Sequence, residues 1–357
     1  MAYASITKPS LHFNTKLYSG NASTQAITGV GFQPDWCWFK GRNFADSHVF
    51  IDAVRGTNKA VYSDTTGAET TQTHYFTSFD SDGYTLGNSG IMNGSSKTYA
   101  SWNWKAGTTG SGTTTGSGTG KTYSYSVNTT SGFSIINYTG NGTIGQQIPH
   151  HLGVAPAMII QKNRDRTSNF LTYHHRNFSS NGNKLNLNTN DATMTDTGTY
   201  YSAPTSTHVV IGNDAGMNTN DESHIMYCFA EKKGYSKFGS YKGNGDSNGT
   251  FIYTGFKPAW VLIKETTDVG AWRIYDSKRG QSGNSIGGNY KNALMADVNS
   301  AEESGATNNI IDFLSNGFKC RFTYNDTNGN GNSYIYIAFA EEPLVANVGA
   351  SIPATAR

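Results

Sequence analysis

Apolar and polar residues alternate along many short segments of the chain. In Ser333–Ala340 (SYIYIAFA), every second side chain would point to the same face of a strand. Trp260–Lys264 (WVLIK) is a second such segment, and both are rich in the β-branched and aromatic residues that strands favour. Clusters of Gly, Asn, Asp and Ser separate the segments, and no stretch combines a helical period with a credible cap. The pattern predicts an all-β chain of antiparallel β-sandwiches of jelly-roll type.

The pattern occurs in three similar copies. Each copy contains a Pro that is followed six residues later by a Lys, in GFQPDWCWFK (31–40), GVAPAMIIQK (153–162) and GFKPAWVLIK (255–264). The three prolines, Pro34, Pro156 and Pro258, are separated by 122 and 102 residues. A repeat of about 100 residues is an ordinary size for a domain, so the spacing indicates three tandem domains.

Two further sets of residues keep the same phase. Upstream of each Pro is a Tyr-x-Gly turn, beginning at Tyr18, Tyr138 and Tyr241. Twelve residues beyond each Lys is a polar residue, at Asp52, His174 and Asp276. We therefore expect three tandem β-sandwich modules, with module 1 at residues 1–106, module 2 at 123–234 and module 3 at 235–343, followed by a C-terminal tail at 344–357.

A tract of Gly, Ser and Thr at 107–122 lies between the first two modules. It reads GTTGSGTTTGSGTGKT and ends like a nucleotide-binding P-loop. The first Gly of that motif would fall at Thr115, and an alternating strand pattern follows the tract where a P-loop needs a helix. We therefore interpret the tract as a flexible tether that accounts for the longer first repeat interval.

Composition and charge narrow the function classes. Only 15% of residues are charged, whereas aromatic residues make up 13%, which indicates a folded chain with a surface of hydroxyls and amides. The net charge of +2 includes no long basic run, so we expect no nucleic-acid partner. We also expect no membrane insertion and see no secretion signal. Three scattered Cys residues without CxxC spacing, Cys37, Cys228 and Cys320, are interpreted as buried thiols.

The repeated carboxylates are the first candidates for catalysis. Asp52 and Asp276 occupy equivalent positions, but a glycosidase needs two carboxyl groups that face one sugar across a cleft. These two belong to different modules, and His174 takes the same position in the second. With Arg55 and Arg279 three residues further on, a structural ion pair or loop clamp is favoured. We expect no enzyme activity, no catalytic residues and no cofactor.

Possible metal ligands are equally weak. His150-His151 and His174-His175 are adjacent pairs, and adjacent residues of a strand point to opposite faces, so solvated loop histidines are favoured over a metal site. Asp326–Gly331 (DTNGNG) resembles the first half of a calcium loop, but Ile337 stands where the bidentate Glu is needed. A hairpin turn is the preferred interpretation there.

The tryptophans leave two interpretations open. Trp36 and Trp38 alternate with Cys37, so they share one sheet face, as do Trp102 and Trp104. Core packing is favoured because large aromatic residues dominate protein cores. The alternative is a platform on which sugar rings stack, with the candidate residues Trp36, Trp38, Trp102, Trp104, Trp260 and Trp272.

Several motifs in series resemble a known family. They are NTKLYSGN, ITGVGFQPDWCWFKGR, INYTGNGTIGQQIPHHLGVAPAMIIQKNR, FIYTGFKPAWVLIK, FLSNGFKCR and IAFAEEP. From about Phe13 to Pro343 the chain resembles a widespread family of repeat-bearing virion proteins of tailed bacteriophages, especially marine ones. The resemblance implies tail or fibre proteins, with modules likened to concanavalin-type lectin sandwiches.

The resemblance leads to our functional expectation. We expect a structural virion protein that acts as a tail fibre or a receptor-binding component in host attachment. The expected partners are other virion proteins, a host surface glycan and further copies of the chain, with a trimer as first choice. The alternatives are a capsid decoration protein (head fibre or cement), a carbohydrate-binding module, and a polysaccharide depolymerase.

Overall fold

The computed structural model describes residues 4–178, 182–195, 202–279, 289–290, 292–303 and 310–343. Within these ranges the helices are single turns, and every longer element is a β-strand. The turns are η1 (Pro9–Leu11), α1 (Gly90–Asn93), α2 (Ala215–Asn218) and α3 (Asn325–Asn328). All strand pairs are antiparallel, and the sheets pack as sandwiches, so the predicted fold class is confirmed. The predicted C-terminal tail lies outside the described residues.

Module 1 consists of a large sheet and a small sheet. The large sheet has the order β1 (Phe13–Ser19), β9 (Thr98–Trp104), β3 (Trp36–Gly41), β4 (Val49–Asp52), β5 (Lys59–Tyr62), β6 (Thr70–Thr71). The small sheet has the order β2 (Gln25–Thr28), β8 (Gly83–Leu86), β7 (Phe76–Asp80). The two sheets enclose an apolar core that belongs to this module alone, with Ile27, Phe39 and Tyr84 among its members.

Modules 2 and 3 repeat this arrangement. The large sheet of module 2 is β10 (Thr108–Thr113), β12 (Thr122–Asn128), β13 (Phe133–Thr139), β20 (Ser223–Phe229), β15 (Met158–Asn163), β16 (Leu171–His174), β17 (Asn183–Asn186), β18 (Met194–Thr195). Its small sheet is β11 (Thr115–Gly116), β14 (Gln146–Pro149), β19 (His208–Ile211). The large sheet of module 3 is β21 (Ser236–Lys242), β29 (Ser333–Pro343), β23 (Phe256–Glu265), β24 (Arg273–Asp276), β26 (Leu294–Met295). Its small sheet is β22 (Phe251–Tyr253), β28 (Gly317–Cys320), β27 (Ile311–Leu314), β25 (Asn289–Tyr290).

The tract at 107–122 is not a tether, which corrects the sequence-based interpretation. Strand β10 pairs with β12 along the edge of the large sheet of module 2, and β11 pairs with β14 in its small sheet. Gly110 and Gly112 lie opposite Tyr125 and Tyr123, and a Cβ on either glycine would approach those rings within 2.6–2.8 Å. The tyrosine rings therefore lie over the glycines, and this packing gives a low-complexity tract a defined structure.

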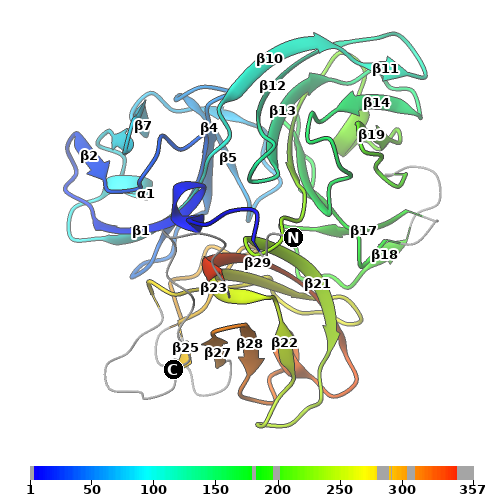
Figure 1. Ribbon diagram of the computed structural model, residues 1–357. Helices are drawn as coiled ribbons and strands as arrows, with labels where there is room; N and C mark the ends of the chain where they lie inside the picture. The colour runs from blue at the N-terminus through cyan, green and yellow to red at the C-terminus, as the bar shows by residue number, and fades with distance from the viewer. Residues whose placement is uncertain are drawn as a thin grey trace.

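The three large sheets share one central core, which we call the hub. In Figure 1 the three modules surround it, coloured blue, green, and yellow to red. The inner face of each large sheet contributes side chains, including Trp36 and Trp104 from module 1, Phe229 from module 2, and Trp260 and Phe339 from module 3. Each large sheet is therefore covered on both faces, by the hub and by its own small sheet.

Candidate functional site

The six tryptophans lie in the core and cannot form a sugar platform. Each is at most 2% exposed. Rings from other modules lie against five of them, as where Trp36 stacks on Tyr227 of module 2 with 4.5 Å between ring centroids. The interpretation of Trp36, Trp38, Trp102, Trp104, Trp260 and Trp272 as core residues is confirmed, and the glycan alternative for them is wrong.

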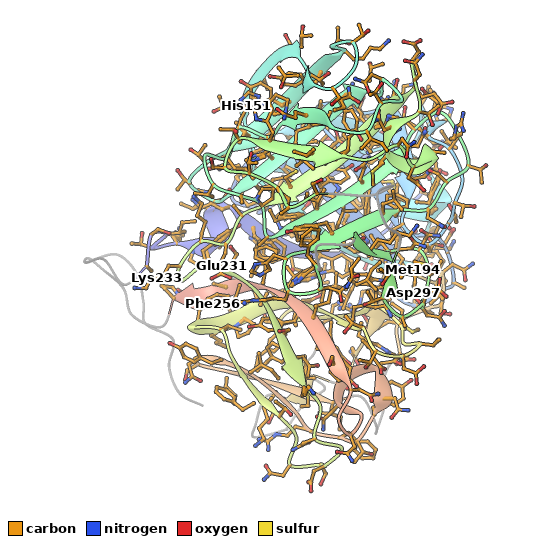
Figure 2. The ribbon with its side chains drawn as sticks, turned by 90° about the vertical axis from the view of Figure 1, so that its right-hand side faces the viewer. His151, Met194, Glu231, Lys233, Phe256 and Asp297 are labelled. Atoms are coloured by element: carbon orange, nitrogen blue, oxygen red, sulfur yellow. The ribbon has the colours of Figure 1, made fainter. Side chains whose placement is uncertain are left out.

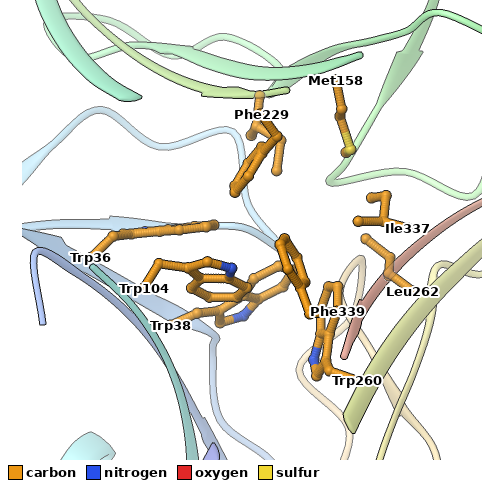
Figure 3. A pocket seen from close by; sticks show the side chains of 10 residues that line it. Trp36, Trp38, Trp104, Met158, Phe229, Trp260, Leu262, Ile337 and Phe339 are labelled. Carbon is orange, nitrogen blue, oxygen red and sulfur yellow. The ribbon is translucent and has the colours of Figure 1, made fainter. Parts of the chain in front are cut away.

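The centre of the hub leaves no room for a ligand. Figure 3 shows aromatic and aliphatic side chains of all three modules converging there. The space between them is about 10 Å³, which is at the lower limit for a single water molecule, and its lining is apolar. The hub therefore holds the modules together and does not bind small molecules.

The junction between modules 1 and 2 is built around Asp52 and Arg55. Both side chains are fully buried, and Arg55 Nε lies 2.5 Å from Asp52 Oδ2. Tyr227, from β20 of module 2, donates its hydroxyl to the same oxygen over 2.8 Å. Burial lowers the pKa of Arg55, but Asp52, Tyr227 and Glu69 together raise it by more, so the guanidinium stays charged. The predicted structural ion pair is confirmed, and it links two modules.

The junction between modules 3 and 1 repeats this arrangement with a different donor. Asp276 and Arg279 form the equivalent fully buried ion pair. The indole Nε1 of Trp102, from β9 of module 1, donates to Asp276 Oδ2 over 2.9 Å. Trp102 and Tyr227 occupy equivalent places in the last strands of their modules. The same carboxylate position thus accepts a hydrogen bond from the neighbouring module in both junctions.

His174 occupies the carboxylate position at the junction between modules 2 and 3. Its Nε2 lies 3.3 Å from the carbonyl oxygen of Tyr336 in β29. Burial lowers the pKa of His174 to about 3, so the ring is neutral; Nδ1 accepts from the Arg176 amide, and Nε2 donates. The residue equivalent to Trp102 and Tyr227 is Ile337, which has no polar atom. A neutral imidazole that bonds to the backbone therefore replaces the carboxylate, and the ring of three junctions closes.

A second layer of charges extends two of the junctions. Glu69 of module 1 lies 3.0 Å from Arg55 and 2.7 Å from Arg164 of module 2. Glu302 of module 3 in the same way lies 3.0 Å from Arg279 and 2.9 Å from Arg42 of module 1. The repeat motifs do not include these residues. A sequence signal does exist for the two arginines, because Arg42 and Arg164 both stand eight residues after the Pro of their repeat, Pro34 and Pro156.

The repeated lysines are also structural. Lys40, Lys162 and Lys264 are at most 1% exposed and donate to neighbouring oxygens. Lys40 reaches Asn299 O of module 3 over 3.2 Å, and Lys264 reaches Asn190 O of module 2 over 3.1 Å. Burial lowers the pKa of each lysine to about 8. Lys40 and Lys264 of the repeat therefore contribute to contacts between modules, whereas Lys162 donates to oxygens of module 2 itself.

Side chains of the histidine pairs and of the calcium-like segment are engaged in hydrogen bonds within the fold. His150 and His174 are buried, which corrects the expectation of solvated loop histidines, and His150 Nε2 lies 3.1 Å from Thr205 O. Asp326 accepts from Arg273 Nε over 2.7 Å and lies in α3, not in a hairpin turn. Within the described ranges no group of three metal-binding side chains occurs. The three cysteines are buried and unpaired, as expected.

A surface pocket among the described residues is a candidate binding site. It has a volume of about 180 Å³ and lies where the segment after β20 meets the turn between β22 and β23. Its lining combines charged side chains with one aromatic ring and consists of Glu231, Lys233, Gly234, Ser236, Lys237, Tyr253, Thr254 and Gly255. In Figure 2, Glu231 and Lys233 lie close to Phe256 at the start of β23.

Comparison with known proteins identifies the family. Residues 8–343 match the domain of unknown function DUF7483. The chain belongs to the DUF7483 family. No curated protein and no solved structure matches it. The match spans all three modules, so the DUF7483 domain is the whole assembly around the hub. Its described residues also include no helix of the length and apolarity needed to cross a membrane.

Proposed function

We propose that this DUF7483 chain is a structural virion protein of a tailed bacteriophage that acts in host attachment as a tail fibre or receptor-binding component. The observation that carries the proposal is the closed ring of junctions. The repeated polar residues Asp52, His174 and Asp276 all serve contacts between modules. Such a chain is a rigid base from which surface loops and edges can present binding groups.

The sequence motifs supply the second support. The motifs from Phe13 to Pro343 resemble those of repeat-bearing phage virion proteins, and this range coincides with the DUF7483 match at 8–343. An attachment role also suits the polar, weakly charged surface that the composition indicates. A depolymerase would need catalytic carboxylates other than Asp52 and Asp276, because both are buried in ion pairs.

The experiment is to locate the chain on purified particles of the phage that encodes it. Mass spectrometry of the particles should detect the chain, and gold-labelled antibodies should mark the tail tip in negative-stain images. Labelling over the head would support the capsid decoration alternative and overturn the attachment role. Absence from the particles would overturn a virion function of either kind.

A further inference from the structure

The small sheet of module 3 has exposed aromatic residues, whereas the described residues of the small sheets of modules 1 and 2 include none. Strand β22 carries Phe251, which is 42% exposed, and Tyr253, which is 54% exposed, on either side of the buried Ile252. Phe322, 37% exposed, follows the neighbouring strand β28. We call Phe251, Tyr253 and Phe322 the aromatic strip.

The repeat provides an internal comparison for these positions. The buried residue equivalent to Ile252 is Ile27 in module 1 and Ile148 in module 2, each paired with a buried residue of the neighbouring strand. The residues flanking Ile27 are Ala26 and Thr28, and those flanking Ile148 are Gln147 and Pro149. The same sandwich therefore forms with small or polar residues there, so the fold does not require aromatic rings on this strand.

Both rings of the strand lie against glycine backbone. A Cβ built on Gly255 would lie 3.6 Å from the Tyr253 hydroxyl oxygen and 3.7 Å from two ring carbons. A Cβ on Gly317 would lie 3.1 Å from a ring carbon of Phe251. Both rings nevertheless leave a large part of their surface to solvent, since Phe251 is 42% and Tyr253 is 54% exposed, and this exposed ring surface is what stacking on a flat apolar ligand needs.

The pocket beside Tyr253 adds polar groups to this face. Lys237 Nζ lies 2.6 Å from Glu231 Oε1, and both side chains line the pocket together with Tyr253. The carboxylate accepts hydrogen bonds and the ammonium donates them, so the pair can bind two adjacent hydroxyls. A volume of about 180 Å³ suits a single sugar ring rather than a drug-sized ligand.

We propose that the pocket and the aromatic strip form a binding site for a pyranose saccharide, whose apolar face would stack on Tyr253 while its hydroxyls bond to Glu231 and Lys237. Phe251 would extend the stacking surface to a second sugar unit. Three partly exposed rings form a patch much smaller than the roughly 800 Å² per partner that a stable protein interface buries. The inference deepens the proposed attachment function by naming its ligand class.

The test is saturation-transfer NMR on the full chain with the methyl glycosides of glucose, galactose, mannose and N-acetylglucosamine. Transfer to at least one glycoside is expected. Tyr253→Ala should abolish the signal or weaken binding about tenfold, whereas Tyr253→Phe should retain it. The matched control is Thr28→Ala, the equivalent position of module 1, which should change nothing. Circular dichroism and thermal melts of each variant establish that the fold is intact.

Three outcomes would overturn the inference. They are no transfer to any of the four glycosides, transfer that Tyr253→Ala leaves intact, and a wild-type dimer in sedimentation that Tyr253→Ala converts to a monomer. The last outcome would make the strip a contact between copies of the chain. Particle labelling is independent of all three, so a chain found at the tail tip without a sugar signal keeps the proposed function and loses this site.

Discussion

At the scale of single residues, the donor and the acceptor of one hydrogen bond change together between modules 2 and 3. In module 2, Asn163 Nδ2 donates to Glu222 Oε2 over 2.7 Å. In module 3 the same two positions hold Glu265 and Asn332, and the amide of Asn332 donates to Glu265 Oε1 over 2.6 Å. The amide and the carboxylate have exchanged places while the hydrogen bond persists. Modules 2 and 3 therefore keep the contact although the residue at each position differs, whereas module 1 has Gly41 and Lys97 at these positions.

The exchange leaves Glu265 in an unfavourable environment, which leads to a prediction about pH. Burial, with Asp268 and Asp326 nearby, raises the pKa of Glu265 to about 7. Its Oε2 has no hydrogen-bond partner among the described residues. The folded state therefore binds the carboxyl proton of Glu265 more tightly than the unfolded state does. The protonated carboxyl contributes its full stabilisation below about pH 4.5, and this contribution is lost as the pH rises through about 7. Glu265→Gln should therefore stabilise the protein by about 1–2 kcal/mol at pH 8 and have little effect near pH 4.5.

Urea denaturation of both proteins at the two pH values measures this difference. Glu222→Gln is the matched control. Glu222 is held ionised by Arg166 and Asn163, which lower its pKa despite the opposing effect of burial, so its substitution should not stabilise the protein at pH 8. A Glu265→Gln variant that is no more stable than wild type at pH 8 would contradict the account.

The junctions allow a second prediction at this scale. His174→Asp alone would place a buried carboxylate against the carbonyl oxygen of Tyr336, and we expect a loss of about 3 kcal/mol or more. Adding Asn177→Arg would supply the counterpart of the Arg55 cation, and adding Ile337→Tyr would supply the counterpart of the Tyr227 hydroxyl. Both of these groups bond to Asp52 at the first junction. The triple variant should recover at least about 2 kcal/mol of the loss in chemical denaturation, because partners in one network couple. Strictly additive losses would contradict the equivalence of the three junctions.

At the scale of elements, alternation and repeats predicted the strands, the antiparallel sandwiches and the equivalence of Asp52, His174 and Asp276. They did not predict the hub. The uninterrupted apolar run WCWF in β3 is typical of a strand buried on both faces, but a local pattern cannot identify what covers the second face. Composition also failed at 107–122, because it ignores the tyrosines across the ladder that make Gly110 and Gly112 necessary.

That pairing gives a prediction for strand β10. Gly110→Val would bring a side chain against the ring of Tyr125, where even a Cβ would lie 2.6 Å from the hydroxyl oxygen. We expect a loss of about 1–3 kcal/mol, of which Tyr125→Ala in the same chain should restore part. Thr109→Val, at the adjacent exposed position of β10, is the control and should be nearly neutral. Thermal melts measure all four proteins, and an unaffected Gly110→Val variant would mean that the tract is a loose tether after all.

At the scale of the whole molecule, the three modules form a closed ring. Each module contributes a carboxylate or imidazole to one neighbour and the last strand of its large sheet to the other, so the interface is head-to-tail and closes after three units. One chain thus builds an arrangement that other proteins obtain from three subunits. Because every large sheet has one face in the hub, we expect the three modules to unfold together.

Hydrogen exchange measured by mass spectrometry tests this cooperativity. Phe229→Ala removes a hub ring that contacts Trp104 of module 1 and Phe339 of module 3, and we expect a loss of about 3–5 kcal/mol. Amides in all three large sheets should then exchange faster, because the exchange of core amides follows global opening. Val209→Ala removes two methyl groups from the core that belongs to module 2 alone and is the control. If the modules are one cooperative unit, both variants should speed amide exchange in all three large sheets, each in proportion to its loss of stability. If Phe229→Ala accelerates only the sheet of module 2, the hub does not couple the modules, and the rigid base on which the proposed attachment function rests fails with it.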